Sequence, residues 1–388
     1  MPKIIHCILH NLFHDQRLHR IALTLSEKYE VEVVGINRGK ESPLPQRPYR
    51  MHRLFIPIRR GPLFFLIGNF RFFWFLLWRR WDGVIAYDLA ALPGCWLAAF
   101  LRRKPILLDS RELFTQTPFL VHRPLVRRIW ELAERLLYPR VAYIITVSPP
   151  IARYYQQRYR KPTWLVYNLP PRAQTLNEPS LSRKLLLYQG MLHPYRGLEE
   201  VIAAMAYAEG WSLWVLGDGP LRPKLEQLIQ RYNLQERVRL WGMVSPEELP
   251  SYTKQATFGI SGELPHGLNH TYAMPNKFFD YLQQGIPVLV GEAPLLQKLV
   301  RYYRCGAIVS PWHPEHIAKF LQNSDLLNTE YGVWVENARK AASLFHWDTQ
   351  KGCLLRWVEY ALERKSLPPQ QEEVACRVVS EIARVLEG

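Results

Sequence analysis

The chain has 388 residues, of which 48% are hydrophobic; this is enough for two domains of ordinary size and excludes an intrinsically disordered protein. The 5 cysteines are scattered without C-x-x-C spacing, so the sequence indicates neither a disulfide framework nor a zinc site and favours a reducing, cytoplasmic compartment. The formal net charge of +16 is confined to the first half: residues 1–170 hold 27 Lys and Arg against 11 Asp and Glu, whereas residues 171–388 hold 23 of each. The first half should therefore attract an anionic partner: a nucleic acid, an acidic polymer or a membrane surface.

Short runs rich in Val, Ile and Leu alternate with longer helical patterns, as expected for parallel sheets that are covered by helices on both faces. The strands expected in the first half are residues 3–9, 31–34, 51–56, 83–86, 106–109, 143–147 and 163–166, and a helix is expected at residues 14–28. The apolar run at the N-terminus is brief and has no small-residue cleavage site after it. We therefore interpret it as the first strand and not as a secretion signal.

Residues 61–78 are strongly apolar and allow three interpretations. As a membrane-spanning helix the segment is barely long enough, and Gly68, Asn69 and Arg71 lie in its middle. As a buried helix of a doubly wound fold it stands in the right place between two strands. As a helix that exposes aromatic side chains beside the arginines at positions 59, 60, 79 and 80, it would enter a membrane interface. The last two interpretations are compatible with each other.

The alternation breaks near residues 168–172 and resumes in the second half. There the expected strands are residues 185–189, 212–216, 238–240, 257–260, 287–290 and 307–309, and the chain after Trp347 is mostly helical. We expect an α/β protein with one doubly wound, Rossmann-like domain at 1–170, a second at 171–350, and C-terminal helices at 351–388 that cross back to the first domain. Such folds bind ligands beyond the carboxyl ends of their strands, here in a central cleft that both domains face.

The segment at residues 273–290 combines a helix start with charged side chains. Lys277 and Asp280 lie three residues apart, so on a helix both face the same way in its first turn. The free N–H groups and the positive end of the helix dipole at that turn favour an anion such as a phosphate. A cation, an anion-binding helix end and a carboxylate that accepts hydroxyl groups suit a sugar nucleotide. The alternative is an ordinary capped surface helix.

Two segments that contain glycine follow earlier strands of the second half. In residues 188–198, Gly190 and Gly197 let the backbone approach a ligand, and Arg196 supplies charge for a diphosphate. In residues 213–220, the sequence Gly-Asp-Gly-Pro that begins at Gly217 ends the next strand in a tight turn. Taken alone, the first segment is equally compatible with a glycine-rich turn and an exposed arginine, and the second is common in turns.

In their order along the chain, these segments resemble the nucleotide-binding half of family-4-type glycosyltransferases of the GT-B fold. The order is strand-G-x(6)-G-helix, strand-G-D-G-P, residues 238–244, and then P-N-K-x-x-D with G-x-P-V. Residues 14–22, 82–89, 107–114 and 146–152 look like the acceptor domain of that family. The resemblance covers nearly the whole chain, and it depends on the ensemble of motifs because no single one of them is specific.

The resemblance implies roles for the residues that match its motifs. Arg196 and Lys277 would hold the diphosphate of the donor and neutralise the charge that develops as the glycosyl–phosphate bond breaks. A metal plays this role in other glycosyltransferases, so no metal or other cofactor is expected here. Asp280 would bind the ribose hydroxyls in place of the glutamate that is usual in the family. The other positions expected to contact the donor are Gly190, Gly217, Met243, Val244, Glu263, Asn269, Tyr272 and Asn276.

The chain departs from the family pattern at several positions. Met191 stands where the family often has an arginine, and Tyr272 replaces the first of a usual pair of glutamates. In the first domain, Tyr87, Asp88 and Arg111 stand where many members have histidines. The candidates for the acceptor side are His14, Asp15 and Arg17 at the start of the first helix, and Asp88, Asp109 and Glu112 at strand ends. For the first group, the alternative is a helix cap made by Asp15.

The resemblance implies a retaining glycosyltransferase that moves a sugar from a nucleotide-sugar donor to a lipid-linked or anionic acceptor, in glycolipid, polysaccharide or cell-envelope glycan synthesis. The basic first half adds an anionic membrane surface as a partner, with the protein peripheral on the cytoplasmic face. A catalytically silent GT-B module that binds a membrane or a partner is the alternative. Nucleic acid is not expected as a partner, because the sequence has no zinc-finger spacing, aromatic RNP signature or basic heptad helix.

Overall fold

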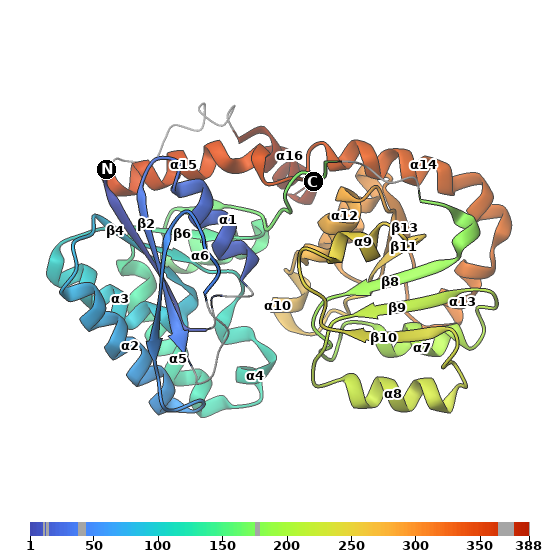
Figure 1. The fold of residues 1–388 in the computed structure, drawn as a ribbon, viewed down its shortest axis with the longest axis horizontal. Helices are drawn as coiled ribbons and strands as arrows, with labels where there is room; N and C mark the ends of the chain where they lie inside the picture. Colours follow the sequence, from blue (N-terminus) through green and yellow to red (C-terminus); the bar gives the residue numbers. More distant parts are fainter. Residues whose placement is uncertain (11, 13–14, 38–43, 175–178, 364–375, 388) are drawn as a thin grey trace. The chain divides into compact units, whose positions relative to one another are not determined.

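The computed structural model describes residues 1–388 apart from positions 11, 13–14, 38–43, 175–178, 364–375 and 388. The chain forms two compact units (Figure 1), one made of Met1–Tyr167 with Gln350–Val379 and the other of Asn168–Thr349 with Ser380–Gly388. The chain passes from the first unit to the second after Tyr167, close to the boundary expected at residue 170. The C-terminal residues, expected to cross back as one block, are instead divided between the two units.

The first unit is built on a sheet of seven parallel strands in the order β3-β2-β1-β4-β5-β6-β7. These strands are β1 (Lys3–Ile8), β2 (Glu30–Asn37), β3 (Arg50–Phe55), β4 (Gly83–Tyr87), β5 (Ile106–Asp109), β6 (Tyr143–Thr146) and β7 (Thr163–Leu165). Each strand expected in the first half is present. Strands β1 and β4 to β6 are almost wholly buried, as expected for a parallel sheet with helices on both faces.

The helices of the first unit are α1 (Gln16–Leu25), α2 (Pro62–Leu77), α3 (Asp88–Arg102), α4 (Pro118–Val121), α5 (Pro124–Leu137), α6 (Pro149–Tyr159) and, from Gln350 onward, α15 (Asp348–Glu363). The connections that contain α2, α3 and α5 each lead to a strand nearer the β7 edge of the sheet, whereas the connection that contains α1 leads to a strand nearer the β3 edge. Because crossovers between parallel strands are right-handed, α2, α3 and α5 cover one face of the sheet and α1 covers the other. A Cβ on Gly94 of α3 would lie 2.1 Å from the carbonyl oxygen of Asn69 on α2, so glycine permits their close packing.

Helix α2 confirms the interpretation of residues 61–78 as a helix of the doubly wound fold, and it also has an exposed apolar side. Phe64, Phe72 and Leu76 are buried in the first unit, whereas Leu66 and Phe70 on the other side of the helix are 66% and 60% exposed. The segment is thus a helix of the doubly wound layer that also presents apolar side chains to solvent. Within the part of the chain that the structure describes, no helix is both long and apolar enough to cross a membrane.

The second unit has a sheet of six parallel strands in the order β10-β9-β8-β11-β12-β13. The strands are β8 (Leu185–Gln189), β9 (Ser212–Leu216), β10 (Val238–Gly242), β11 (Phe258–Ser261), β12 (Val288–Val290) and β13 (Gly306–Ile308). The helices are α7 (Leu198–Met205), α8 (Arg222–Arg231), α9 (Leu249–Thr253), α10 (Gly267–Thr271), α11 (Asn276–Gln283), α12 (Pro294–Tyr303), α13 (Pro314–Gln322), α14 (Ser324–Ala342) and, from Ser380 onward, α16 (Arg377–Glu387). Trp211, Phe258 and Trp334 lie in the hydrophobic core between sheet and helices.

The cysteines correct one sequence-based expectation. Cys353 on α15 and Cys376 just before α16 form a disulfide within the first unit, with 5.6 Å between their Cα atoms and a sequence separation of 23. The interpretation of the cysteines as unpaired is therefore wrong for these two, whereas Cys7, Cys95 and Cys305 are free and buried. The sequence carried no signal for the pair, because two cysteines become neighbours only when the segments that carry them pack together.

Candidate functional site

The loops after β8, β9 and β10 meet at the carboxyl end of the second-unit sheet. The N–H of Gly190 donates to the carbonyl of the last residue of β9 (2.9 Å), and the N–H of Gly217 donates to that of the last residue of β10 (2.7 Å). A Cβ on Gly217 would lie 1.9 Å from the carbonyl oxygen of Gly190, and the φ angle of Gly217 is +137°. Met243, which is 62% exposed, and Val244 follow β10 directly. The four positions expected at the donor site thus belong to one edge of the sheet.

Arg196, in the loop before α7, and Lys277, in the first turn of α11, converge on one carboxylate. Lys277 Nζ lies 2.6 Å from Glu263 Oε1, and an Arg196 guanidinium nitrogen lies 3.6 Å from the same oxygen. The Ser261 hydroxyl donates to the other carboxylate oxygen at 2.6 Å, and the Lys277 ammonium lies 4.0 Å from the centre of the Tyr188 ring. Burial alone would raise the pKa of Glu263, but the two cations and these hydrogen bonds outweigh it and hold the pKa below its usual value. Two positive charges therefore share one negative charge.

Helix α11 differs from an ordinary capped surface helix. The side chain of Lys277 is only 7% exposed, and Phe278 and Phe279 beside it are buried. Pro275 at the start of the helix provides no side-chain cap, and Asn276 at the first helical position is exposed. A buried lysine requires a negative partner to remain charged, and Glu263 is that partner. The structure thus contradicts the surface-helix alternative.

Asp280, one turn after Lys277, is held by a residue that the sequence analysis missed. Gln189 is the last residue of β8, and its side-chain amide donates to Asp280 Oδ2 at 3.0 Å. The amide oxygen of Gln189 accepts from the Thr253 hydroxyl (2.9 Å), and its backbone N–H donates to the Tyr281 hydroxyl (3.1 Å). The side-chain contacts orient the amide, so Gln189 fixes the position of the carboxylate. The one signal in the sequence was a glutamine at the end of an apolar strand.

Aromatic and imidazole rings surround Arg196. Tyr195 stacks on His266 with ring centres 3.7 Å apart, and His270 lies beside them on α10. Burial, followed by the charge of the neighbouring arginine, lowers the pKa of His270 to about 4, so its imidazole is neutral at physiological pH. Asn269 on the same helix is buried, and Tyr272 ends that helix half-buried. These two expected donor contacts therefore lie in the loop that also carries Glu263 and leads to α11.

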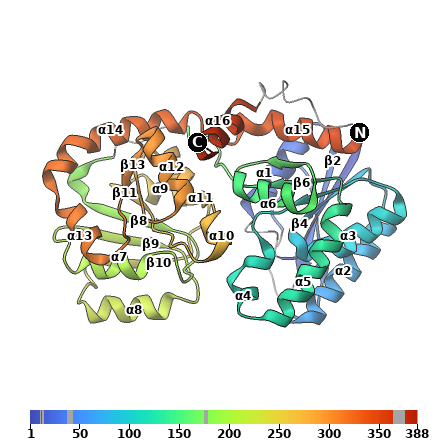
Figure 2. The same ribbon diagram turned by 180° about the vertical axis from the view of Figure 1, so that it is seen from behind.

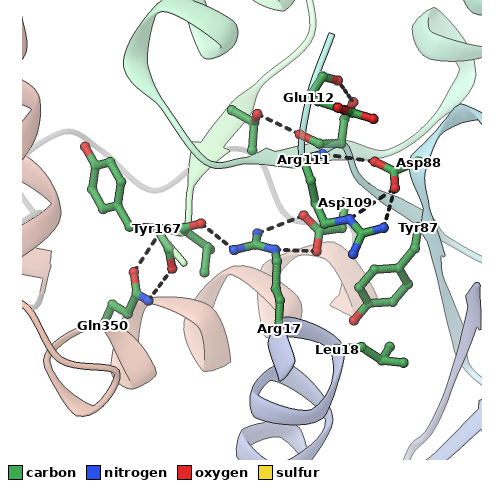
Figure 3. A network of polar contacts seen from close by, with 12 residues as sticks. Arg17, Leu18, Tyr87, Asp88, Asp109, Arg111, Glu112, Tyr167 and Gln350 are labelled. Atoms are coloured by element: carbon green, nitrogen blue, oxygen red, sulfur yellow. Dashed lines mark hydrogen bonds and ion pairs between the residues drawn. The ribbon is translucent and has the colours of Figure 1, made fainter. Parts of the chain in front are cut away.

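In the first unit, Arg17 and Asp109 are paired with each other (Figure 3). The guanidinium donates to both carboxylate oxygens, at 2.9 and 2.8 Å, and to the carbonyl of Val166 at 2.7 Å. The side chains are 2% and 0% exposed, which leaves an acceptor no surface to contact on either. This buried pair ties the start of α1 to the end of β5. We therefore correct the expectation that these two residues belong to the acceptor side.

Arg111 contacts two of the acceptor-side candidates, Asp15 and Asp88. The sequence showed this arginine only as a departure from the family pattern. It donates to Asp88 through its backbone and its guanidinium and to Asp15 at 2.5 Å (Figure 3 shows the contacts to Asp88). Asp15 also accepts from the N–H of Leu18, which confirms that it caps α1. Although burial opposes it, His10 and Arg111 hold the pKa of Asp15 well below its usual range. Asp88 opens α3 with a φ angle of +59°, a left-handed conformation that few residues other than glycine adopt.

Two acceptor-side candidates remain. Glu112 is half-buried, and its backbone carbonyl accepts from the hydroxyl groups of Ser110 and Tyr155. His14 lies outside the residues that the structure describes. Across the described residues, no group of three or more His, Cys, Asp or Glu side chains is arranged to hold a metal ion.

Family models match both halves of the chain. Residues 15–168 match the glycosyl transferase 4-like domain, and residues 183–323 match the glycosyl transferases group 1 domain. Apart from residue 168, each match lies within one of the two units of the structure. The chain therefore belongs to the family-4-type glycosyltransferases with the two Rossmann-like domains of the GT-B fold.

Solved structures agree in fold. A sucrose-phosphate synthase from Thermosynechococcus elongatus has a TM-score of 0.71 with 19% identity and covers 93% of this chain and 100% of its own. The Anabaena protein HepE, solved in complex with UDP-glucose, has a TM-score of 0.71 with 16% identity and covers 92% of this chain and 100% of its own. At these identities the likeness shows the fold alone.

Curated relatives match over shorter segments. The alpha-monoglucosyldiacylglycerol synthase of Streptococcus pneumoniae is 28% identical over 137 residues, which are 34% of this chain and 29% of the relative. The alpha-D-kanosaminyltransferase of Streptomyces kanamyceticus is 37% identical over 147 residues, which are 35% of each chain. The chain thus spans only about a third of the length of these relatives.

Proposed function

We propose that the protein is a retaining, metal-independent glycosyltransferase that transfers a sugar from a nucleotide-sugar donor to a lipid-linked or anionic acceptor. The observation that carries the proposal is the cluster of Arg196, Lys277 and Glu263 at the carboxyl end of the second-unit sheet. Two cations that share one carboxylate leave an excess of positive charge in a buried setting. A diphosphate supplies the negative charge that would balance it.

The chemistry follows from this charge balance. When the bond between the sugar and the diphosphate breaks, its electron pair passes to the phosphate oxygen, and the negative charge on the leaving group grows. Lys277 and Arg196 stabilise that charge more strongly than they stabilise the intact donor, so they lower the barrier. The acceptor hydroxyl then attacks the face that the diphosphate leaves and gives its proton to the departing phosphate oxygen, which retains the configuration without a carboxylate nucleophile. Asp280, oriented by Gln189, binds the ribose hydroxyls.

The names of relatives support an acceptor in glycolipid or cell-envelope glycan synthesis. One is named for monoglucosyldiacylglycerol, and a relative from Rhizobium meliloti is named for lipopolysaccharide core biosynthesis. Together with the basic first half, these names favour a lipid-linked acceptor and a peripheral position on the cytoplasmic membrane face.

A panel of nucleoside diphosphates and sugar nucleotides tests the proposal by thermal shift, with EDTA and again with Mg²⁺. At least one ligand should raise the unfolding temperature equally in both buffers, because a ligand that binds only the folded state stabilises it by mass action. NMR of the product formed with a membrane extract should show a retained anomeric configuration. No shift with any ligand would contradict the proposed donor site.

The second candidate function is a catalytically silent module of the same fold. It is favoured by Met191 in place of an arginine, and by Asp15 and Asp88, whose carboxylates are both engaged by Arg111. Donor binding without transfer or hydrolysis, on any acceptor fraction, would support this candidate over the enzyme.

A further inference from the structure

Helix α5 exposes an apolar stripe to the solvent. Leu125, Ile129, Leu132 and Leu136 form one stripe at helical spacing, and they are 74%, 68%, 59% and 49% exposed. On the opposite side, Glu134 is buried and accepts a hydrogen bond from the Tyr159 hydroxyl at 2.5 Å. A helix on the surface of a water-soluble domain normally buries its apolar stripe and exposes its carboxylates. Here an apolar stripe faces the solvent, whereas the inner side carries the buried Glu134 together with the half-buried Trp130 and Leu137.

Helices α2 and α3 extend this stripe into a broader surface. Both lie in the layer with α5 that covers one face of the first-unit sheet (Figure 2), and α3 packs against α2 and α5. Phe65 of α2 also packs edge-on against Trp130 of α5. Because the three helices share one layer, their exposed sides point away from the same sheet. We define the apolar face as Leu63, Leu66, Phe70, Trp74 and Trp78 of α2 and its end, Leu97, Phe100 and Leu101 of α3, and Leu125, Ile129, Leu132 and Leu136 of α5. These are half of the large apolar side chains that are exposed in the described part of the chain.

The charges around the apolar face are mostly positive. Nine exposed arginines lie on or next to its three helices: Arg59, Arg60, Arg71, Arg80, Arg103, Arg123, Arg128, Arg135 and Arg140. Each carboxylate of the same helices is paired or buried within the unit, since Asp88 pairs with Arg111, the partly exposed Glu131 pairs with Arg127, and Glu134 is buried. The face therefore combines exposed Leu and Trp side chains with an excess of cations, and the partly exposed carboxylates of its helices are already paired with arginines.

We propose that the apolar face docks the first unit on an anionic lipid surface, with its Leu and Trp side chains inserted at the headgroup level and its arginines paired with lipid phosphates. Tryptophan favours this level of a bilayer, and each basic residue near an anionic surface strengthens the attraction. A second copy of the chain is a poorer occupant, because two such faces would bring an excess of arginines together, and the carboxylates of their helices are already paired. The inference deepens the proposed function by naming the surface that meets a lipid-linked acceptor.

Vesicle flotation of the full chain tests the inference. The protein should float with vesicles made of equal parts phosphatidylcholine and phosphatidylglycerol, and much less with phosphatidylcholine alone. The variant Ile129→Ser/Leu132→Ser should lower the partition coefficient at least about tenfold, the factor that corresponds to ~1.4 kcal/mol. The variant Arg128→Ser/Arg135→Ser should lower it on the anionic vesicles and remove most of its dependence on salt.

Matched controls lie in the second unit. Leu326 and Val333 on α14 are 36% and 37% exposed, so Leu326→Ser/Val333→Ser removes comparable side chains away from the apolar face and should float as the wild type does. Nucleoside diphosphate binding and the unfolding temperature of each variant show that the protein is folded and that its donor site is intact. Loss of flotation with donor binding retained supports the inference independently of the transfer activity.

Two results would overturn the inference. One is flotation that is equal for the wild type and the Ile129→Ser/Leu132→Ser variant. The other is a wild type that does not float and sediments as a dimer, which the same substitutions convert to a monomer; the face would then be an interface between copies.

Discussion

The two units each contain a cluster of buried ion pairs, and the clusters differ in charge balance. In the first unit, Arg17 meets both oxygens of Asp109, so one cation matches one carboxylate and neither is exposed. In the second unit, Arg196 and Lys277 share Glu263, so one positive charge has no balancing carboxylate within the cluster. A balanced buried pair holds a fold together, whereas an unbalanced one can take up a further anion. This difference separates a structural cluster from a candidate site, although both consist of the same residue types.

The largest expected effect is a loss of stability when the balanced pair of Arg17 and Asp109 is broken. Arg17→Met leaves the Asp109 carboxylate buried without a partner, and this should lower the free energy of unfolding by about 3–5 kcal/mol. Chemical denaturation followed by circular dichroism measures the change. Arg127→Met serves as the control, because its pair with Glu131 is partly exposed and should contribute less than about 0.5 kcal/mol. Equal losses in the two variants would show that the buried pair has no special role in the fold.

The next largest expected effect is a loss of donor affinity when the cations of the unbalanced cluster are removed. Lys277→Met should weaken binding of a nucleoside diphosphate by about 100-fold or more, since a buried charge-assisted contact to phosphate is lost. Arg196→Met should weaken it less, because Arg196 is 27% exposed and water screens its charge. Isothermal titration calorimetry measures both. Lys224→Met, which removes an exposed pair with Glu199 in the same unit, should leave the affinity unchanged. Unchanged affinity in the double variant of Arg196 and Lys277 would remove the basis of the donor site.

A smaller expected effect distinguishes the contacts to the ribose from the contacts to the phosphates. Gln189→Leu removes the hydrogen bond that orients Asp280, and it should weaken binding of a nucleoside diphosphate by about three- to tenfold, which corresponds to the net free energy of a typical hydrogen bond, about 0.7–1.4 kcal/mol. Binding of inorganic pyrophosphate, which has no ribose, should not change. Thr253→Val is a milder variant because it removes only the contact that holds the amide. An equal loss for both ligands would mean that Gln189 acts on the phosphate loop and not through Asp280.

The smallest expected effect is on the pH dependence of stability, to which Glu263 of the unbalanced cluster contributes. The pKa of Glu263 is lower in the folded protein than in the unfolded chain, so its contribution to stability is present above the unfolded pKa and is lost as the pH falls through the folded pKa. The stability of the wild type should therefore decrease in acid more steeply than that of Glu263→Gln. Urea denaturation at several pH values between neutrality and the acid limit measures the two slopes. Parallel curves would show that Glu263 has the same pKa in both states.

The elements and their class were predictable from the sequence, because they depend on local periodicity. Each expected strand from residue 3 to residue 309 is present, since Val- and Ile-rich runs between helical patterns are typical of buried parallel strands. The spacing of Lys277 and Asp280 correctly predicted that both lie on one helix near its start. The order of the glycine and P-N-K motifs predicted the family, which the domain matches confirm.

Partners that are distant in the sequence were not predictable in the same way. Arg17 and Asp109 appeared as two acceptor-side candidates, and only the packing of α1 against the end of β5 paired them. Glu263 appeared as a donor contact, and Gln189 and the Cys353–Cys376 disulfide did not appear at all. Periodicity likewise reveals an apolar stripe on α5 but not whether it faces the sheet or the solvent. Local spacing determined which side chains share a face of an element, whereas the tertiary packing decided what each face meets, because that depends on contacts between segments many residues apart.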